Sequence, residues 1–236
     1  QYFHFPHSPV VISNACISGV SAILTGKKLI AAGLYDQAVV AGVDIVTEFV
    51  LTGFHSFMAL SDQPCKPYDE SRNGINIGEA CGTVLLSKDP GICDEKDSFS
   101  EIAGGGQSND ANHISGPSRT GDGLSIAIEK ALQESSISIS DVDYINAHGT
   151  ATLYNDEMEA VAFHRAGLGN IPINSLKGYY GHTLGTAGVL ETILSLMALE
   201  NQILIPSKGF DKLGVSIELP VITQKVKKTT TSFLKT

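Results

Sequence analysis

The sequence predicts an α/β fold, because short apolar segments that suit strands alternate with segments of helical periodicity along its 236 residues. The run 38–43 is continuously apolar, as expected for a strand covered on both faces of a mostly parallel sheet. The segments 16–33 and 185–200 are small and apolar on most faces, as expected for buried central helices. Both follow a strand, a turn and a reactive residue, so the sequence predicts two related halves.

The first half is predicted to contain three strands around one buried helix. Strands are expected at 9–12, 36–44 and 76–87, and the buried helix at 16–33. The segment 45–63 is expected to be a mixed loop or helix. A charged turn at 88–97 is the predicted boundary. The two halves would then be 1–97 and 98–236.

The second half is predicted to repeat a strand–helix rhythm. Strands are expected at 99–104, 141–146 and 171–176, and helices at 123–134, 155–165 and 185–200. A polar loop is expected at 108–121. A loop and a pair of strands are expected after residue 206. The polar loop contains His113, for which we expect hydrogen bonds within the loop.

Composition and charge exclude several classes of function. The net charge of −9 and the lack of a basic block argue against a nucleic-acid partner. No apolar run reaches the roughly 18 residues of a membrane span. The cysteines, Cys16, Cys65, Cys81 and Cys93, lack the spacing of zinc ligands, so no metal site is predicted. Scattered cysteines in a chain of this length indicate a reducing, cytoplasmic location.

Cys16 lies where an apolar run meets the first predicted helix. In the first turn of a helix, a thiol faces unpaired N–H groups and the positive end of the helix dipole. The pKa of the Cys16 thiol is therefore expected to fall below its usual value of about 8.5, as in a nucleophile. The alternative is a buried structural cysteine, which is the commoner role of a lone cysteine on an apolar helix.

Three further reactive side chains follow predicted strands. His148 comes after the strand 141–146, and Lys177 and His182 come after the strand 171–176. Sites in open α/β sheets gather at the carboxyl ends of strands, so we expect these groups to converge with Cys16. A single histidine after a strand is more often a turn residue, but two of them beside a strand-end cysteine favour catalysis.

Four motifs occur in a fixed order along the chain. They comprise Asn-Ala-Cys-Ile-Ser-Gly at 14–19, an arginine turn at 67–74 followed by Gly-Glu-Ala-Cys-Gly at 78–82, Asn-Ala-His-Gly-Thr-Ala-Thr at 146–152, and a lysine–histidine segment at 175–188. In this order they resemble the motifs of β-ketoacyl-acyl carrier protein synthases, condensing enzymes of the thiolase-like superfamily. The resemblance implies a layered α-β-α-β-α thiolase-like fold with two related halves.

The resemblance also implies roles for the four reactive residues. Cys16 would carry the acyl chain as a thioester. His148 and His182 would donate hydrogen bonds to a malonyl thioester carbonyl as it becomes an enolate. Lys177 would add positive charge and orient the histidines. Glu191 matches a family carboxylate that would join this network, and a partnered core carboxylate is the alternative.

Three residues match substrate-binding positions of the family. Thr150 and Thr152 would hydrogen-bond the phosphopantetheine arm, and turn chemistry beside Gly149 is an alternative role that can hold together with the first. Phe54 would lie near the acyl pocket, and core packing explains it equally well.

The implied activity is acyl transfer to Cys16 followed by decarboxylative Claisen condensation with malonyl-acyl carrier protein, in fatty-acid or polyketide-like chain elongation. The partners would be acyl carrier protein carrying acyl and malonyl groups, and a second copy of the chain in a homodimer. No cofactor is expected, because the phosphopantetheine arm arrives with the carrier protein. A thiolase acting on coenzyme A thioesters is an alternative, although its second reactive cysteine would be expected after His182, where none occurs.

A non-catalytic partner subunit that sets chain length is another alternative, although such subunits lack the nucleophile. The resemblance leaves two family regions without a match: over a hundred residues before Gln1, and a Gly-Phe-Gly-Gly loop expected after Thr236. Both ends therefore look like cuts in a longer protein, the thiolase-like fold would be incomplete, and the piece alone is expected to lack activity.

Overall fold

The computed structural model describes residues 7–92, 99–112 and 116–236, and its helices and strands confirm the α/β class. His113 and Cys93 lie outside the described residues. The six α-helices of the described residues are α1 Ser18–Ala31, α2 Glu48–Ser56, α3 Asp122–Ser135, α4 Leu153–Arg165, α5 Lys177–Tyr180 and α6 Ala187–Glu200. The strands are β1 Gln37–Asp44, β2 Ala80–Ser87, β3 Ile145–Asn146, β4 Ile173–Asn174, β5 Ile203–Leu204, β6 Val226–Lys227 and β7 Leu234–Lys235.

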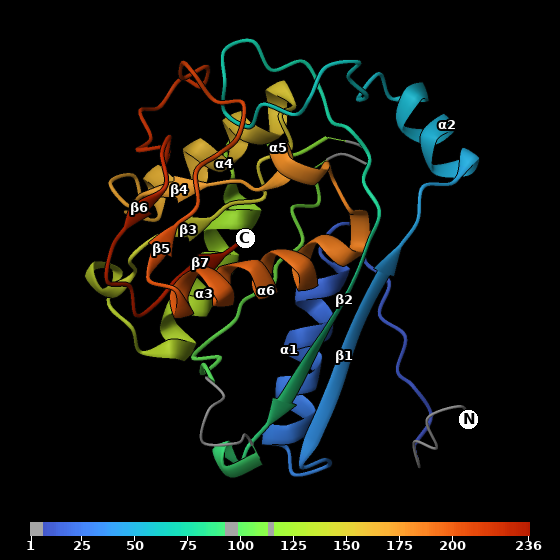
Figure 1. Cartoon of the computed structure of the whole chain (residues 1–236), viewed down its shortest axis with the longest axis vertical. Coiled ribbons are helices and arrows are strands. Elements are labelled where there is room, and N and C mark those ends of the chain that lie inside the picture. Colours follow the sequence, from blue (N-terminus) through green and yellow to red (C-terminus); the bar gives the residue numbers. More distant parts are fainter. Residues whose placement is uncertain (1–6, 93–98, 113–115) are drawn as a thin grey trace.

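One layer of the molecule is a long antiparallel ribbon of β1 and β2, with α1 and α6 on one face (Figure 1). Gly42 and Gly82 are cross-strand partners beneath α6, and a side chain at either position would crowd Val189. These glycines therefore let α6 approach the ribbon closely. The core beneath the helices is apolar and consists of Ile23, Ile30, Val40, Leu86 and Val189.

The other face of this ribbon corrects one expectation. The run 38–43 was predicted to be covered on both faces, but its residues alternate, and Val39 and Val43 are 50% and 67% exposed. The pairing with β2 is antiparallel, whereas mostly parallel pairing was expected. Antiparallel sheets can leave one face uncovered, and within the described residues the helices lie on the opposite face.

The other layer contains a short parallel sheet in the order β4-β3-β7. Ile145 and Ile173 of this sheet are fully buried, and they pack with Ile128 of α3 and Phe163 of α4. Residues after β3 and β4 form the turns that carry the reactive side chains. The helices expected at 123–134, 155–165 and 185–200 are confirmed to within two residues at either end.

Two expected strands do not form. The segment 9–12 forms no regular element, and Val10 and Val11 are 64% and 84% exposed. The segment 99–104 is also irregular, although Ile102 packs against the core beneath α1. Both segments are apolar enough for strands, but a strand also needs a neighbour to satisfy its N–H and C=O groups, and neither has one among the described residues.

No helix among the described residues is both long and apolar enough to cross a membrane. The predicted division into 1–97 and 98–236 stays a prediction.

The closest approach of α1 and α6 occurs at two glycines. A Cβ atom at Gly188 would lie 2.4 Å from the backbone nitrogen of Val20, and one at Gly19 would lie 2.6 Å from the backbone nitrogen of Val189. Since Cys16 precedes α1 and His182 precedes α6, this contact also fixes the distance between the two reactive side chains.

We expect the substitution G188A to lower the free energy of unfolding by about 1–3 kcal/mol, because the new methyl group meets the backbone of α1. The measurement is urea denaturation. The matched control is G53A in α2, where a Cβ meets nothing within 4 Å and the higher helix propensity of alanine should leave stability unchanged or raised. Equal behaviour of the two variants would contradict this account of the helix contact.

Candidate active site

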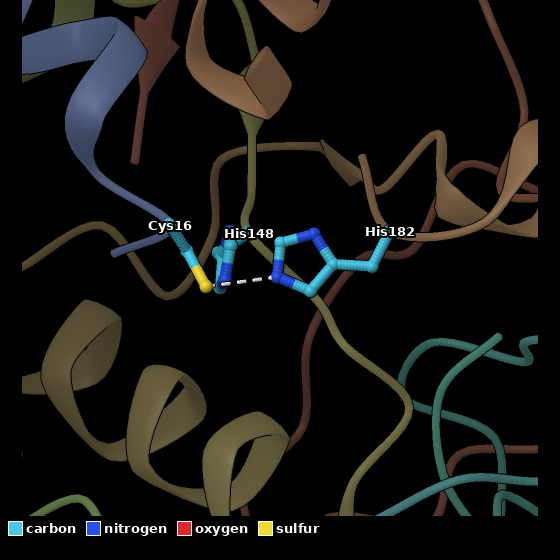
Figure 2. A group of neighbouring side chains, drawn as sticks. All are labelled: Cys16, His148 and His182. Carbon is cyan, nitrogen blue, oxygen red and sulfur yellow. Dashed lines mark hydrogen bonds between the residues drawn. The ribbon is translucent and has the colours of Figure 1, made fainter. Parts of the chain in front are cut away.

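The structure brings Cys16, His148 and His182 together, with their side chains pointing toward one another (Figure 2). The Sγ atom of Cys16 lies 3.0 Å from Nε2 of His182. The two imidazole rings are 5.0 Å apart between centroids and nearly perpendicular, at 81°. One sulfur and two ring nitrogens therefore surround a single point, where a thioester carbonyl would be reached by all three groups.

The turn that carries Cys16 is sharp. Ala15 has a φ of 45°, and the hydroxyl of Ser18 accepts from Asn14 N and donates to Ala15 O. The helix itself begins at Ser18 with Ile17 as its N-cap, so Cys16 lies just before the helix and not in its first turn.

Burial raises the pKa of the Cys16 thiol. The positive charge of Lys177 opposes this shift without cancelling it, and Glu191 and Asp44 add to it. The expectation of a lowered pKa was wrong, because it weighed the helix end and left out the loss of water around the sulfur. The thiol is thus the resting form of Cys16.

Each histidine has a partner that fixes its tautomer. The backbone N–H of Leu184 donates to Nδ1 of His182 at 3.2 Å, and Lys177 Nζ lies 3.2 Å from Nδ1 of His148. Because an N–H or an ammonium group donates, both Nδ1 atoms must accept, which leaves the proton of each neutral ring on Nε2.

Burial also keeps both rings neutral. It lowers the pKa of His182 to about 3, with Lys177 adding to the effect. The pKa of His148 is held well below its usual range by burial, with further contributions from Lys177, His182 and Lys235. Two neutral imidazoles with Nε2–H groups are hydrogen-bond donors, and Nε2 of His182 lies 3.0 Å from the cysteine sulfur.

Lys177, the first residue of α5, is fully buried and contacts both His148 and Glu191. Its Nζ donates to the backbone oxygen of His148 at 2.6 Å and to Oε1 of Glu191 at 2.6 Å. The side chains of Lys177 and Glu191 are both 0% exposed. Lys235 contacts the other carboxylate oxygen, Oε2, at 2.8 Å. Although burial opposes it, the two lysines hold the pKa of Glu191 below its usual value.

The main chain of His148 rests on a second buried carboxylate. Glu159 of α4 accepts from the backbone N–H groups of His148 and Gly149 at 2.9 and 2.7 Å, and from the hydroxyl of Tyr68 at 2.9 Å. Asp156 lies one turn earlier, and burial raises its pKa to about 7. Glu159 therefore fixes the loop, and with it the position from which the His148 ring reaches the site, whereas Asp156 accepts from the backbone N–H of Tyr68.

The three predicted substrate-binding residues lie in the loop after β3 or close to it. The hydroxyls of Thr150 and Thr152 are 2.9 Å apart, and Thr152 is the N-cap of α4. Phe54 of α2 is partly buried against a small cluster that includes Ala151. The packing role of Phe54 is thus confirmed, and the substrate-binding roles of all three residues stay predictions.

The donor atoms of Cys16, His148 and His182 all lie within 4.8 Å of one another, close enough to share one metal ion. A metal would need the lone pair of Nε2 on each ring, where the fixed tautomers carry the proton. Moving that proton to Nδ1 would set it against the N–H of Leu184 or the ammonium of Lys177. The hydrogen bonds therefore favour two donors over two ligands.

Two sequence models of one family match consecutive parts of the chain. "Beta-ketoacyl synthase, N-terminal domain" matches residues 3–90, and "Beta-ketoacyl synthase, C-terminal domain" matches residues 99–211. The chain belongs to the β-ketoacyl synthase family.

Curated relatives and solved structures agree with this assignment. The 3-oxoacyl-[acyl-carrier-protein] synthase 2 of Rhizobium meliloti (strain 1021) is 33% identical over 235 residues, which cover 94% of this chain and 55% of that protein. The chain spans about half the length of the curated relatives it matches.

A chain of the structure of a ketosynthase in complex with its chain length factor, from Xenorhabdus doucetiae, superposes with a TM-score of 0.85 at 34% identity, covering 93% of this chain and 54% of that one. A chain of the complex of a type II polyketide synthase acyl-carrier protein with its ketosynthase superposes with a TM-score of 0.87 at 28% identity, covering 93% of this chain and 57% of that one. These matches confirm the thiolase-like ketosynthase fold.

Two residues of this β-ketoacyl synthase site were missed in the sequence. Glu159 lies three residues after Asp156 on one face of α4, so two acidic residues on a buried helix face were the available signal. Lys235 gave no signal in the sequence, because a lysine in a segment that contains other lysines is typical of a solvent-exposed strand. Only the position of β7 beside β3 reveals its place at Glu191.

The depressed pKa values of the two histidines predict how stability depends on pH. The unfolded chain binds a proton at each histidine near pH 6.5, whereas folded His182 binds one only near pH 3. The free energy of unfolding should therefore rise with pH. Lowering the pH from 6.5 to 5 should reduce it by about 1.5 kcal/mol through His182 alone.

The measurement is urea denaturation at pH 6.5 and 5.0 on the wild-type protein and on H182N. Since H182N removes the titrating group, its stability should fall less between these two pH values. The control is H55N, on an exposed residue of α2, which should keep the wild-type dependence. A wild-type dependence in H182N would show that His182 is not neutral in the folded protein.

Proposed function

We propose that the protein containing this chain is a β-ketoacyl-acyl carrier protein synthase, an acyltransferase that elongates fatty-acid or polyketide-like chains. The observation that carries this proposal is the pair of buried, neutral histidines with fixed Nε2–H groups beside a cysteine sulfur. Such donors stabilise an oxygen that gains negative charge, which is the demand of malonyl decarboxylation.

The first step is transfer of the acyl chain to Cys16. The sulfur attacks the thioester of the acyl-carrier protein, and the thiol proton ends on the departing phosphopantetheine thiol. Donation from Nε2–H of His182 at 3.0 Å stabilises the sulfur as it gains negative charge. The raised pKa of Cys16 means that little thiolate exists beforehand, so this hydrogen bond acts during the attack.

The second step is decarboxylation of malonyl-acyl carrier protein. The malonyl thioester carbonyl accepts from Nε2–H of His148 and His182, loss of carbon dioxide leaves an enolate, and both donors stabilise its oxygen. The enolate carbon then attacks the Cys16 thioester and releases the Cys16 thiolate, which takes up a proton. Protonated histidines would bind the malonyl carboxylate as an ion pair and hold it back, so neutral rings suit this step.

The proposed function also assigns the substrate-binding residues and the partner proteins. We assign Thr150 and Thr152 to the amides of the phosphopantetheine arm, which brings the only prosthetic group, and Phe54 to the wall of the acyl pocket. Acyl carrier protein and a second copy of the chain are the proposed partners. A chain from the structure of an acyl-carrier protein in complex with its ketosynthase is similar to this chain, which supports acyl carrier protein as a partner. The cytoplasmic location stays a prediction.

A chain-length partner subunit is a second candidate, because one of the similar structures contains a ketosynthase with its chain length factor. The presence of Cys16, His148 and His182 in one cluster favours the catalytic subunit.

Acyl loading tests the proposed nucleophile. The full-length natural protein, incubated with an acyl-acyl carrier protein thioester and digested, should carry the acyl mass on the peptide that contains Cys16. C16A should lose loading and condensation, whereas C81A, at an exposed position of β2, should keep both. Acyl mass on another cysteine, or none at all, would contradict this function.

Malonyl decarboxylation separates the histidines from the cysteine. C16A should still decarboxylate malonyl-acyl carrier protein, because the two Nε2–H donors remain. H148A and H182A should each lose about 100-fold or more in decarboxylation kcat, the cost of removing an oxyanion donor. Release of carbon dioxide measures this, and circular dichroism confirms the fold. Decarboxylation that survives both histidine changes would sink the assigned role.

A further inference from the structure

A second lysine lies in the buried centre of the site, and the proposed mechanism gives it no task. Lys235 of β7 is 9% exposed at its side chain, and its Nζ lies 2.8 Å from Oε2 of Glu191. Lys177 holds the other oxygen of the same carboxylate at 2.6 Å. The three side chains form a continuous line of charges, lysine to glutamate to lysine, that ends at Nδ1 of His148.

Strand register places Lys235 there. β7 pairs in parallel with β3, so Lys235 is the partner of Asn146, two residues before His148. The next residue, Thr236, accepts from the backbone N–H of His148 at 3.2 Å and donates to Glu159 at 3.1 Å. The end of β7 therefore touches both supports of His148: the carboxylate under its main chain, and the ion pairs behind its ring.

We propose that Lys235 is a positioning residue of this active site, which fixes the Glu191 carboxylate so that Glu191 in turn aims Lys177 at His148. The proposal rests on the proposed condensing function, because the geometry it preserves is that of the Nε2–H donor of His148.

The balance of buried charge supports this assignment. The cations Lys177 and Lys235 both contact the Glu191 carboxylate behind the histidines, and the buried carboxylate of Glu159 acts on Lys235 without contact. Removing Lys235 leaves two buried carboxylates with one buried lysine. An uncompensated buried charge is strongly unfavourable, so the remaining lysine would be drawn between both oxygens of Glu191 and away from Nδ1 of His148.

The contacts also explain why a lysine suits this position. Glu191 is 0% exposed, and water cannot replace a missing partner of its second oxygen. Burial lowers the pKa of Lys235, and Glu191 opposes that shift.

The test is a double-mutant cycle on the full-length natural protein, with decarboxylation of malonyl-acyl carrier protein as the readout. K235M should lower kcat by about 10- to 100-fold, the loss seen when a group that orients a functional imidazole is removed. K235R keeps the charge and should restore most of the activity. K227M, on the exposed strand β6, is the matched control and should equal the wild type.

Non-additivity shows whether Lys235 acts through Glu191. If it does, K235M/E191Q should be no slower than E191Q alone, because Lys235 has lost its target. The proposal is overturned if the two losses multiply, if K235M equals the wild type, or if K235R is as slow as K235M. Should K235M fail to fold, K235Q takes its place in the cycle.

A second readout separates this proposal from the proposed function. Urea denaturation of the same four proteins measures the coupling between positions 235 and 191 without any substrate. If the wild type releases no carbon dioxide, the proposed function fails, while a stability coupling still shows the ion-pair contact. An active wild type without coupling in either readout overturns the role of Lys235 alone.

Discussion

The buried ion pair of Lys177 and Glu191 is the interaction on which the site depends. Both side chains are 0% exposed and their charged atoms are 2.6 Å apart. Such a pair contributes little net stability, because the loss of hydration offsets most of the attraction. Its value here is positional. The lysine that pairs with Glu191 also donates to the backbone oxygen of His148 and faces Nδ1 of its ring. One ammonium group therefore fixes the place and the tautomer of the histidine, and it adds to the burial that lowers the pKa of the ring.

The fold delivers these groups through backbone contacts more than through side chains. Glycines in α1 and α6 let the helices meet at backbone distance, which sets Cys16 against His182. The backbone N–H of His182 donates to Asn76 O at 2.7 Å and its oxygen accepts from Gly78 N at 2.9 Å, so the segment before β2 holds the histidine from the other side. A site assembled from main-chain contacts has few soft degrees of freedom, which suits donors that must be preorganised.

The sequence allowed the site to be predicted better than the pairing of the strands. Reactive residues after apolar strands are a local pattern, and so the convergence of Cys16, His148, Lys177 and His182 could be expected. Whether a segment becomes a strand depends on a neighbour far along the chain. The runs 9–12 and 99–104 have the composition of strands and no partner among the described residues, and β1 pairs antiparallel. Lys235 was missed for the same reason, since only strand register shows which lysine enters the core.

Burial acts on the cysteine and on the histidines in opposite ways for function. It removes charge from all three groups, so it makes the imidazoles neutral donors and at the same time disfavours the thiolate. In a serine–histidine pair, the histidine acts as a base and removes the proton of the nucleophile. Here the ring nitrogen nearest the sulfur already carries a proton, so it cannot remove the proton of the thiol. The arrangement therefore gives up part of the reactivity of the thiol and keeps two donors for the enolate of the proposed reaction. This suits the proposed reaction, because the two donors are needed from decarboxylation until the new carbon–carbon bond has formed.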